Sequence, residues 1–350
     1  MTPHIVIALD GMGGDQAPEL VVLGADIAYE RMPDIIFKLV GNEEELLPLV
    51  RSSKYLNENN CDIIHTLQKV GDSEKPSVAL RSGRKSSMRL AIDLVSDGDA
   101  HGVVSAGNTG ALMAMSKLGL RMCPGIERPA IASFFPTLTG ESCMLDLGAN
   151  IECDSNNLVQ FAVMGQIFAR IVLGLDRPSV GLLNVGSEEQ KGHEELREAA
   201  GVLKQIDLPM EFVGFVEGDD ITAGTVDVIV TDGFSGNIAL KAAEGTSRMF
   251  THFMKEAFRS SIYSKMGYLL SRGAITQLRE RMDPRKYNGA VFLGLNGIAV
   301  KSHGGTDAVG FANAVGVTAD MARFGFLDKV KDELSILHKN NDLTDYQEEV

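Results

Sequence analysis

The sequence predicts an α/β protein built as three layers, α/β/α, around a mostly parallel sheet. Short runs of apolar, β-branched residues alternate with longer helical patterns along most of the chain. This alternation is typical of strand–helix–strand units, whose strands pair in parallel. The strands are apolar throughout rather than on alternate residues, which indicates that helices cover both faces of the sheet.

Each expected element has a local reason. Strands are expected where apolar β-formers run together, at 4–9, 35–40, 61–66, 102–105, 130–135, 143–147, 179–185, 211–216 and 226–231. Helical spacing fills most of the gaps, for example at 155–173 and 193–205. Residues 236–283 have helical spacing almost throughout, and VFLGLNGIAVKSHGG (291–305) returns to strand character.

Composition limits the class of protein. The chain has 350 residues, of which 44% are hydrophobic and 23% charged, and these ordinary globular values exclude fibrous and disordered classes. No apolar run approaches the roughly 20 residues that a membrane span needs. The N-terminus lacks the basic region of a secretory signal, so a cytoplasmic protein is expected. The net charge of −14 argues against binding to nucleic acid.

Neither a linker between domains nor a pairing pattern of cysteines is found in the sequence. Because there is no Pro/Ser-rich linker and no marked shift in composition, we expect a single α/β domain over 1–340 and a tail at 341–350. The four cysteines form no CxxC pair, which favours buried thiols over a disulfide framework or a zinc site.

Gly, Asp, Asn and Ser gather where the expected strands end. The segments are DGMGGD (10–15), SAGNTG (105–110), DLGAN (146–150), NVGSEEQKG (184–192), EGDD (217–220), DGFSGN (232–237) and LNGIAVKSHGG (295–305). The carboxyl ends of parallel strands lie along one edge of a sheet, where ligands bind. Gly lets backbone N–H groups approach a ligand, and the following helix N-terminus favours an anion. The sequence therefore predicts a phosphate site along one sheet edge.

The candidate residues of this site fall into two groups. Those expected to bind phosphate or substrate are Asp10, Gly13, Gly14, Gly107, Thr109, Asn150, Asn184, Asp232, Gly233, Ser235 and Gly236. Those expected to act in catalysis are Asn108 and Asn237 in the two Gly-Asn turns, Lys191 and Lys301 as cations for phosphate, and His303 as an acid–base group.

Each of these loops also has a purely structural interpretation. Gly, Asp, Asn and Ser are the commonest residues of turns and helix N-caps, and lysines are usually solvated surface groups. No segment matches a GxGxxG dinucleotide fingerprint or a P-loop, and no fixed spacing of metal ligands is present. Neither a metal nor an organic cofactor is expected.

Eight stretches taken together resemble the phosphate acyltransferase (PlsX) family. They are DGMGGDQAP (10–18), SAGNTGALMA (105–114), RPAIA (128–132), LDLGAN (145–150), LLNVGSEEQKG (182–192), VEGDDI (216–221), VTDGFSGNIALK (230–241) and GLNGIAVKSHGGTD (294–307). They occur in order over nearly the whole chain. The departures are small: Gln190 stands where a basic residue is expected, and Gly305-Thr306 replaces a Ser pair.

The resemblance implies both a fold and a reaction. The fold would be similar to that of phosphotransacetylases and of isocitrate and isopropylmalate dehydrogenases, and the protein would be a homodimer. The reaction would move a fatty acyl group from acyl-[acyl-carrier-protein] to inorganic phosphate, giving acyl phosphate for phospholipid synthesis. Phosphate is then the nucleophile, so the site needs positioning and oxyanion donors rather than a covalent intermediate.

Two partner surfaces follow from the resemblance. The carrier protein is acidic, and RSGRKSSMR (81–89) offers Arg81, Arg84, Lys85 and Arg89 for its docking. The helical segment 250–283 is basic and amphipathic, so Ile262, Met266, Leu269 and Leu270 are expected to contact a membrane surface reversibly. Periodicity alone favours the alternative, a helix that faces the core or a dimer partner and has a solvated basic side.

Two rival functions share most of these observations. A phosphotransacetylase acting on acyl-CoA would have the same fold and chemistry. A non-catalytic scaffold, recruited to the membrane for lipid enzymes, would need the basic helix but not the many Gly, Asn and Asp turns. Those turns favour an enzyme.

Overall fold

The strands of the computed structural model lie close to the expected positions. The structure describes residues 4–281, 283 and 285–335. Its strands are β1 (Ile5–Asp10), β2 (Ile35–Gly41), β3 (Cys61–His65), β4 (Gly102–Ser105), β5 (Ala130–Pro136), β6 (Glu141–Leu145), β7 (Ser179–Leu183), β8 (Glu211–Val216), β9 (Val228–Val230), β10 (Ala290–Leu293) and β11 (Ile298–Lys301). Every expected strand overlaps one of these.

Helices separate most of the strands, as the alternating pattern predicts. They are α1 (Glu19–Arg31), α2 (Glu43–Ser52), α3 (Pro76–Ser82), α4 (Ser87–Ser96), α5 (Thr109–Leu120), α6 (Ser155–Val172), α7 (Glu194–Leu203), α8 (Asp220–Ala223), α9 (Gly233–Arg259), α10 (Ile262–Leu270), α11 (Arg272–Arg281) and α12 (Ala308–Arg323). A last helical segment covers 326–335. The expected tail at 341–350 lies outside the described residues, and a single domain over 1–340 stays a prediction.

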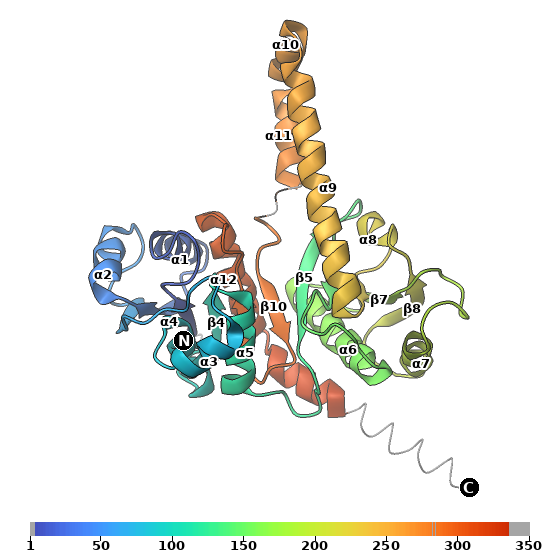
Figure 1. Cartoon of the computed structure of the whole chain (residues 1–350), viewed down its shortest axis with the longest axis horizontal. Helices are drawn as coiled ribbons and strands as arrows, with labels where there is room; N and C mark the ends of the chain where they lie inside the picture. The colour runs from blue at the N-terminus through green and yellow to red at the C-terminus, as the bar shows by residue number, and fades with distance from the viewer. Residues whose placement is uncertain (1–3, 282, 284, 336–350) are drawn as a thin grey trace.

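One eleven-stranded sheet joins the two halves of the described chain (Figure 1). Its strand order is β3-β2-β1-β4-β11-β10-β5-β6-β9-β7-β8. Helices α1, α12, α6 and α7 pack on one face, around a core that runs through both halves. On the opposite face, α3, α4 and α5 cover the first half of the sheet, while α8 and the base of α9 cover the second. The predicted α/β/α layering is confirmed.

The direction of the strands reverses in the middle of the sheet. Strands β3, β2, β1, β4 and β11 are mutually parallel, and so are β6, β9, β7 and β8. Between them, the β11–β10, β10–β5 and β5–β6 pairs are all antiparallel. The carboxyl ends of the two parallel groups therefore lie at opposite edges of the sheet. The expectation of one shared edge is wrong.

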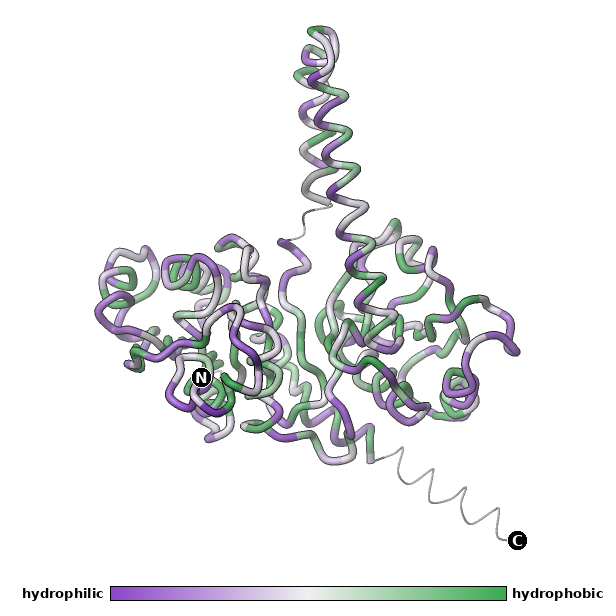
Figure 2. Tube along the Cα trace, in the orientation of Figure 1, coloured by the Kyte–Doolittle hydropathy of each residue, from purple (hydrophilic) through white to green (hydrophobic). Residues whose placement is uncertain are grey.

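Helices α9, α10 and α11 form an arm that stands away from the sheet (Figure 1). Only Gly233 and Gly236, in the first turn of α9, are buried in that helix. Hydrophobic and hydrophilic residues are interleaved along the arm (Figure 2). None of the helices within the described residues is both long and apolar enough to cross a bilayer.

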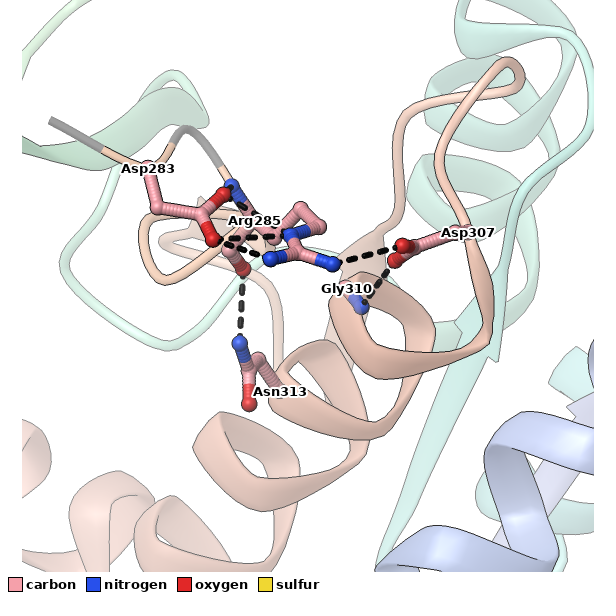
Figure 3. Close-up of polar contacts among 5 residues, drawn as sticks. All are labelled: Asp283, Arg285, Asp307, Gly310 and Asn313. Atoms are coloured by element: carbon pink, nitrogen blue, oxygen red, sulfur yellow. Dashed lines mark hydrogen bonds and ion pairs between the residues drawn. The ribbon is translucent and has the colours of Figure 1, made fainter. Parts of the chain in front are cut away.

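The end of the arm returns to the sheet through a clamped segment (Figure 3). Arg285 pairs with Asp283 and, through Nη1, with Asp307 Oδ2 at 2.9 Å. Asp307 caps α12 by accepting a 3.0 Å hydrogen bond from Gly310 N–H. The Asn313 side chain donates to the Arg285 carbonyl at 2.7 Å. The arm is thus fixed to the body at both of its ends.

Candidate functional site

The loops after β1, β4 and β11 converge in a first cluster, which comprises residues 10–15, 105–109 and 301–305. Asp15 N–H donates to the Gly304 carbonyl at 3.4 Å, which joins the first loop to the third. A Cβ atom added to Gly13 would lie 2.9 Å from Gly107 N, and one added to Gly14 would lie equally close to Ala106 Cβ. Glycine is needed at both positions because the loops approach so closely.

Two buried charged groups hold the first cluster together. Asp10 accepts hydrogen bonds of 2.6 Å from both Ser87 Oγ and Ser105 Oγ, and burial raises its pKa despite these bonds. Burial lowers the pKa of Lys301 to about 8, and its Nζ donates to the Ala106 carbonyl at 3.2 Å. Both groups are buried, and each makes hydrogen bonds within the protein.

The polar atoms of the Asn108 side chain are also occupied. Its Oδ1 caps α5 by accepting from Ala111 N–H at 2.9 Å. Its Nδ2 donates to the carbonyls of Asp72, at 2.7 Å, and Glu74, at 3.1 Å. Thr109, the next residue, is the exposed first residue of α5. In the structure Asn108 is therefore a helix N-cap, which is the structural interpretation of this Gly-Asn turn.

His303 lies at the exposed rim of the first cluster. The ring Nδ1 of His303 accepts a 3.1 Å hydrogen bond from Gly305 N–H, and the backbone N–H of His303 donates to Asn288 Oδ1 at 2.8 Å. This geometry leaves Nε2 as the ring nitrogen that could exchange a proton with solvent or a ligand.

A second cluster forms at the opposite edge, from the loops after β6 and β7 (residues 146–150 and 184–192) and from the start of α9 after β9 (residues 232–237). These three strands are adjacent in the sheet, about 4.8 Å apart, so their ends form one surface. Asp146 organises the first loop by accepting from the N–H groups of Ile131, Gly148, Ala149 and Asn150 at 2.7–3.1 Å. Burial raises the pKa of Asp146, and these bonds oppose the rise.

Sequence reasoning misses the organising role of Asp146. An Asp that follows a strand is usually an ordinary turn residue. The residues next to Asp146 in the sequence do not indicate that four N–H groups converge on its carboxylate. The predicted site residue Asn150 owes its place to Asp146, because its Nδ2 donates to Asp146 Oδ2 at 2.9 Å and to the Pro129 carbonyl at 2.7 Å.

The start of α9 packs directly against this loop. Asp232 is the N-cap and accepts from both the N–H and the hydroxyl of Ser235, at 2.8 and 2.9 Å. Gly233 N–H donates to the Asn150 carbonyl at 2.7 Å. These bonds fix the first turn of the helix over residues 146–150.

Asn237 differs from Asn108 although both follow glycine. A Cβ atom added to Gly236 would lie 1.9 Å from the Asp146 carbonyl oxygen, so α9 approaches the loop closely there. Asn237 lies one residue further, exposed, with its Oδ1 3.7 Å from the Cβ position of Gly148. No hydrogen bond to another described residue occupies its amide. Asn237 is therefore available to a ligand at a helix N-terminus.

Lys191 completes the second cluster from the β7 loop. Asn184 shapes that loop, since its Nδ2 donates to the Lys191 carbonyl at 3.0 Å and its Oδ1 accepts from Val185 N–H at 2.8 Å. Lys191 Nζ pairs with Glu188 at 2.9 Å, and this hydrogen bond raises the pKa of Lys191. Both side chains are about half exposed, so the pair is weak enough for an anion to compete with Glu188.

Comparisons with known proteins decide the family. The chain matches the family described as "Fatty acid synthesis protein" over residues 5–329. It is 63% identical over 337 residues to a phosphate acyltransferase of Rhodospirillum centenum, covering 96% of this chain and 95% of that protein. The chain belongs to the phosphate acyltransferase family. A phosphate acyltransferase of Paramagnetospirillum magneticum is 56% identical over 337 residues, with 96% of each chain covered.

Solved phosphotransacetylases share the fold of this phosphate acyltransferase family member. A phosphotransacetylase from Streptococcus pyogenes superposes with a TM-score of 0.62 at 18% identity, covering 92% of this chain and 95% of that one. EutD phosphotransacetylase from Staphylococcus aureus gives a TM-score of 0.59 at 18% identity, covering 91% and 94%. At this identity the likeness concerns the fold.

The expected docking residues of the phosphate acyltransferase lie beside the first cluster. Arg81 is in the last turn of α3, and Arg84 and Lys85 occupy the exposed turn before α4. Arg89, in the first turn of α4, is partly buried and pairs with Asp93 at 2.8 Å. Three cations are therefore exposed, on the half of the sheet that does not carry Asn237.

Proposed function

We propose that this chain transfers a fatty acyl group from acyl-[acyl-carrier-protein] to inorganic phosphate, giving acyl phosphate and free carrier protein. Membership of the phosphate acyltransferase family supports the reaction class. The observation that carries the location is the unoccupied Asn237 amide, which lies over Gly148 and follows β9, the strand next to β7, which leads into the loop with Lys191. We therefore assign the reaction to the second cluster.

The second cluster supplies what such a reaction needs. Lys191 and the N-terminus of α9 attract phosphate and hold it against the thioester carbonyl. A phosphate oxygen bonds to the carbonyl carbon, the C–S bond breaks, and the thiolate takes up the proton that phosphate gives up. Asn237 donates to the oxyanion that forms in between, so no covalent enzyme intermediate is required. Within this proposal the first cluster has a supporting role: its buried Asp10 and Lys301 fix the loops of the other half-sheet.

The reaction is tested by incubating the purified chain with palmitoyl-carrier protein, with and without inorganic phosphate, and trapping acyl phosphate with hydroxylamine. Phosphate-dependent hydroxamate is the expected result. Product with palmitoyl-CoA but not with the carrier protein would replace the proposal by the phosphotransacetylase reaction. If the carrier protein binds but no product forms, the non-catalytic scaffold would instead be the supported function.

We further propose that the tip of the arm contacts a membrane surface, which would make the protein cytoplasmic and peripherally membrane-associated. All four predicted contact residues are exposed in α10, and Leu270 is 87% exposed. Exposed cations flank them on the same hairpin: Lys255, Arg259, Lys265 and Arg272. Apolar residues between cations suit an anionic lipid surface. The arms of two chains packed together would equally cover these residues, and a homodimer is part of the proposal.

Replacing Leu269 and Leu270 together by serine should lower binding to anionic vesicles about tenfold, because each leucine contributes through the apolar area that it buries. Flotation with phosphatidylglycerol–phosphatidylcholine vesicles measures this. The control is the double replacement of Leu67 and Leu118 by serine, which removes two similarly exposed leucines from the body. If the α10 variant floats like the wild type but sediments as a monomer, the tip is a dimer contact instead.

A further inference from the structure

Four large apolar side chains are exposed around the second cluster. Their exposed fractions are 73% for Ile151, 78% for Val185, 59% for Phe234 and 53% for Ile238. Each lies next in sequence to a residue of the predicted site: Asn150, Asn184, Gly233 and Asn237 respectively. The four residues come from the loops after β6 and β7 and from the start of α9, which follow adjacent strands. We call them the apolar collar.

The polar bonds of the site hold the apolar collar in place. Ile151 follows Asn150, whose carbonyl accepts from Gly233 N–H. Val185 N–H donates to Asn184 Oδ1 at 2.8 Å. Phe234 and Ile238 are one turn apart on α9 and therefore project from the same side of that helix. The loop that carries Ile151 and the start of α9 that carries Phe234 and Ile238 are therefore bonded to each other, and Val185 is held within its own loop.

The first cluster has no comparable ring of apolar residues. Asp10 is followed by Gly11, and Lys301 by Ser302. Asn108 lies between Gly107 and Thr109. None of these neighbours is a large apolar residue, although the same kind of polar loop is present. Of the two clusters, only the second therefore has exposed large apolar residues next to its site residues.

Scattered exposed apolar residues need no explanation, but four that adjoin the residues of one polar site in the sequence, at the ends of neighbouring strands, indicate a ligand. That ligand must carry an apolar part directly beside the polar group that the site binds. An acyl chain attached to a reacting carbonyl has this form. We propose that the apolar collar binds the acyl chain of the donor, from the carbons beside the carbonyl to carbons beyond the fourth. The inference rests on the proposed function and names the part of the substrate that this side of the site recognises.

The test uses two donors that differ only in chain length, butyryl- and palmitoyl-carrier protein. The variants are Val185→Ser and Phe234→Ser, combined in one chain; both positions are exposed, so the fold should be retained. Because every methylene removed from water contributes, we expect the KM for the palmitoyl donor to rise about tenfold. The KM for the butyryl donor should change less than the KM for the palmitoyl donor. Leu67→Ser, at a residue 76% exposed on the other half of the protein, should change neither.

The outcomes separate this inference from the proposed reaction. An equal rise in KM for both donors, or no rise for either, would overturn the apolar collar while leaving the reaction intact. If the wild-type chain turns over neither donor, the reaction itself fails. In that case, the equilibrium affinities of the wild type and the variant for the two donors test the binding role of the apolar collar separately. A loss of affinity confined to the palmitoyl donor supports that role, and unchanged affinity refutes it.

Discussion

Replacement of Asn237 by alanine should lower turnover about 100- to 1000-fold, which is the usual loss when one oxyanion donor is removed. Folding should be unaffected, because the Asn237 side chain is exposed and makes no hydrogen bond within the described residues. The measurement is the initial rate of acyl phosphate formation at saturating phosphate, together with the thermal unfolding midpoint of the same preparation.

Asn108 provides a matched control for Asn237. Both are asparagines that follow a glycine, but Asn108 caps α5 and donates to two carbonyls, whereas Asn237 lies within α9, just after its first turn. Asn108→Ala should therefore lower the free energy of unfolding by about 1–3 kcal/mol and leave the turnover of the folded enzyme within a few-fold of wild type. If Asn237→Ala turns over at the wild-type rate, Asn237 does not stabilise the oxyanion, and the assignment of that role to the second cluster is wrong.

Replacement of Gly236 by alanine should lower the free energy of unfolding by about 3 kcal/mol, at the upper end of what an added methyl group costs in a packed region. The new Cβ would lie 1.9 Å from the Asp146 carbonyl oxygen, and a backbone atom cannot rotate away as a side chain can. Either the first turn of α9 or the loop 146–150 must move. Activity should fall with stability, since both segments form the second cluster. Urea unfolding monitored by circular dichroism gives the change in free energy.

Gly245→Ala is the control for Gly236→Ala, because it makes the same change within the same helix. No atom lies within 4 Å of a Cβ added to Gly245. Alanine should there raise the free energy of unfolding by about 0.5–1 kcal/mol, through the better helix propensity. Equal unfolding midpoints for the two variants would mean that α9 is not packed against Asp146 in solution.

The strands could be predicted from the sequence because each is a short apolar run that a turn residue ends. β4 occupies the predicted residues 102–105, and β8 the predicted 211–216. β9 is shorter than predicted, at Val228–Val230, although the backbone groups of Asp227 and Thr231 on either side still bond to the neighbouring strands. An apolar run indicates that both faces of a strand are covered, and it can be recognised from the residues of the segment itself.

The division into two clusters could not be predicted, because strand direction depends on partners far away in sequence. β10 and β5 are apolar like the parallel strands, and nothing in either run marks it as antiparallel to its neighbours. The two Gly-Asn turns show the same limit. Whether Asn108 or Asn237 is free depends on whether distant carbonyls, such as those of Asp72 and Glu74, reach its side chain.

The unbroken length of α9 limits how the molecule would stand on a lipid surface if the α10 tip makes the proposed contact. The helix has 27 residues and no proline, so it extends about 40 Å from its first turn. Its first turn belongs to the second cluster, and its far end leads into the α10 tip. A protein held upright by the tip alone would keep the reacting carbonyl about 40 Å from the lipid headgroups. For the product to pass directly into a bilayer, α9 must lie along the surface, with the body resting beside it.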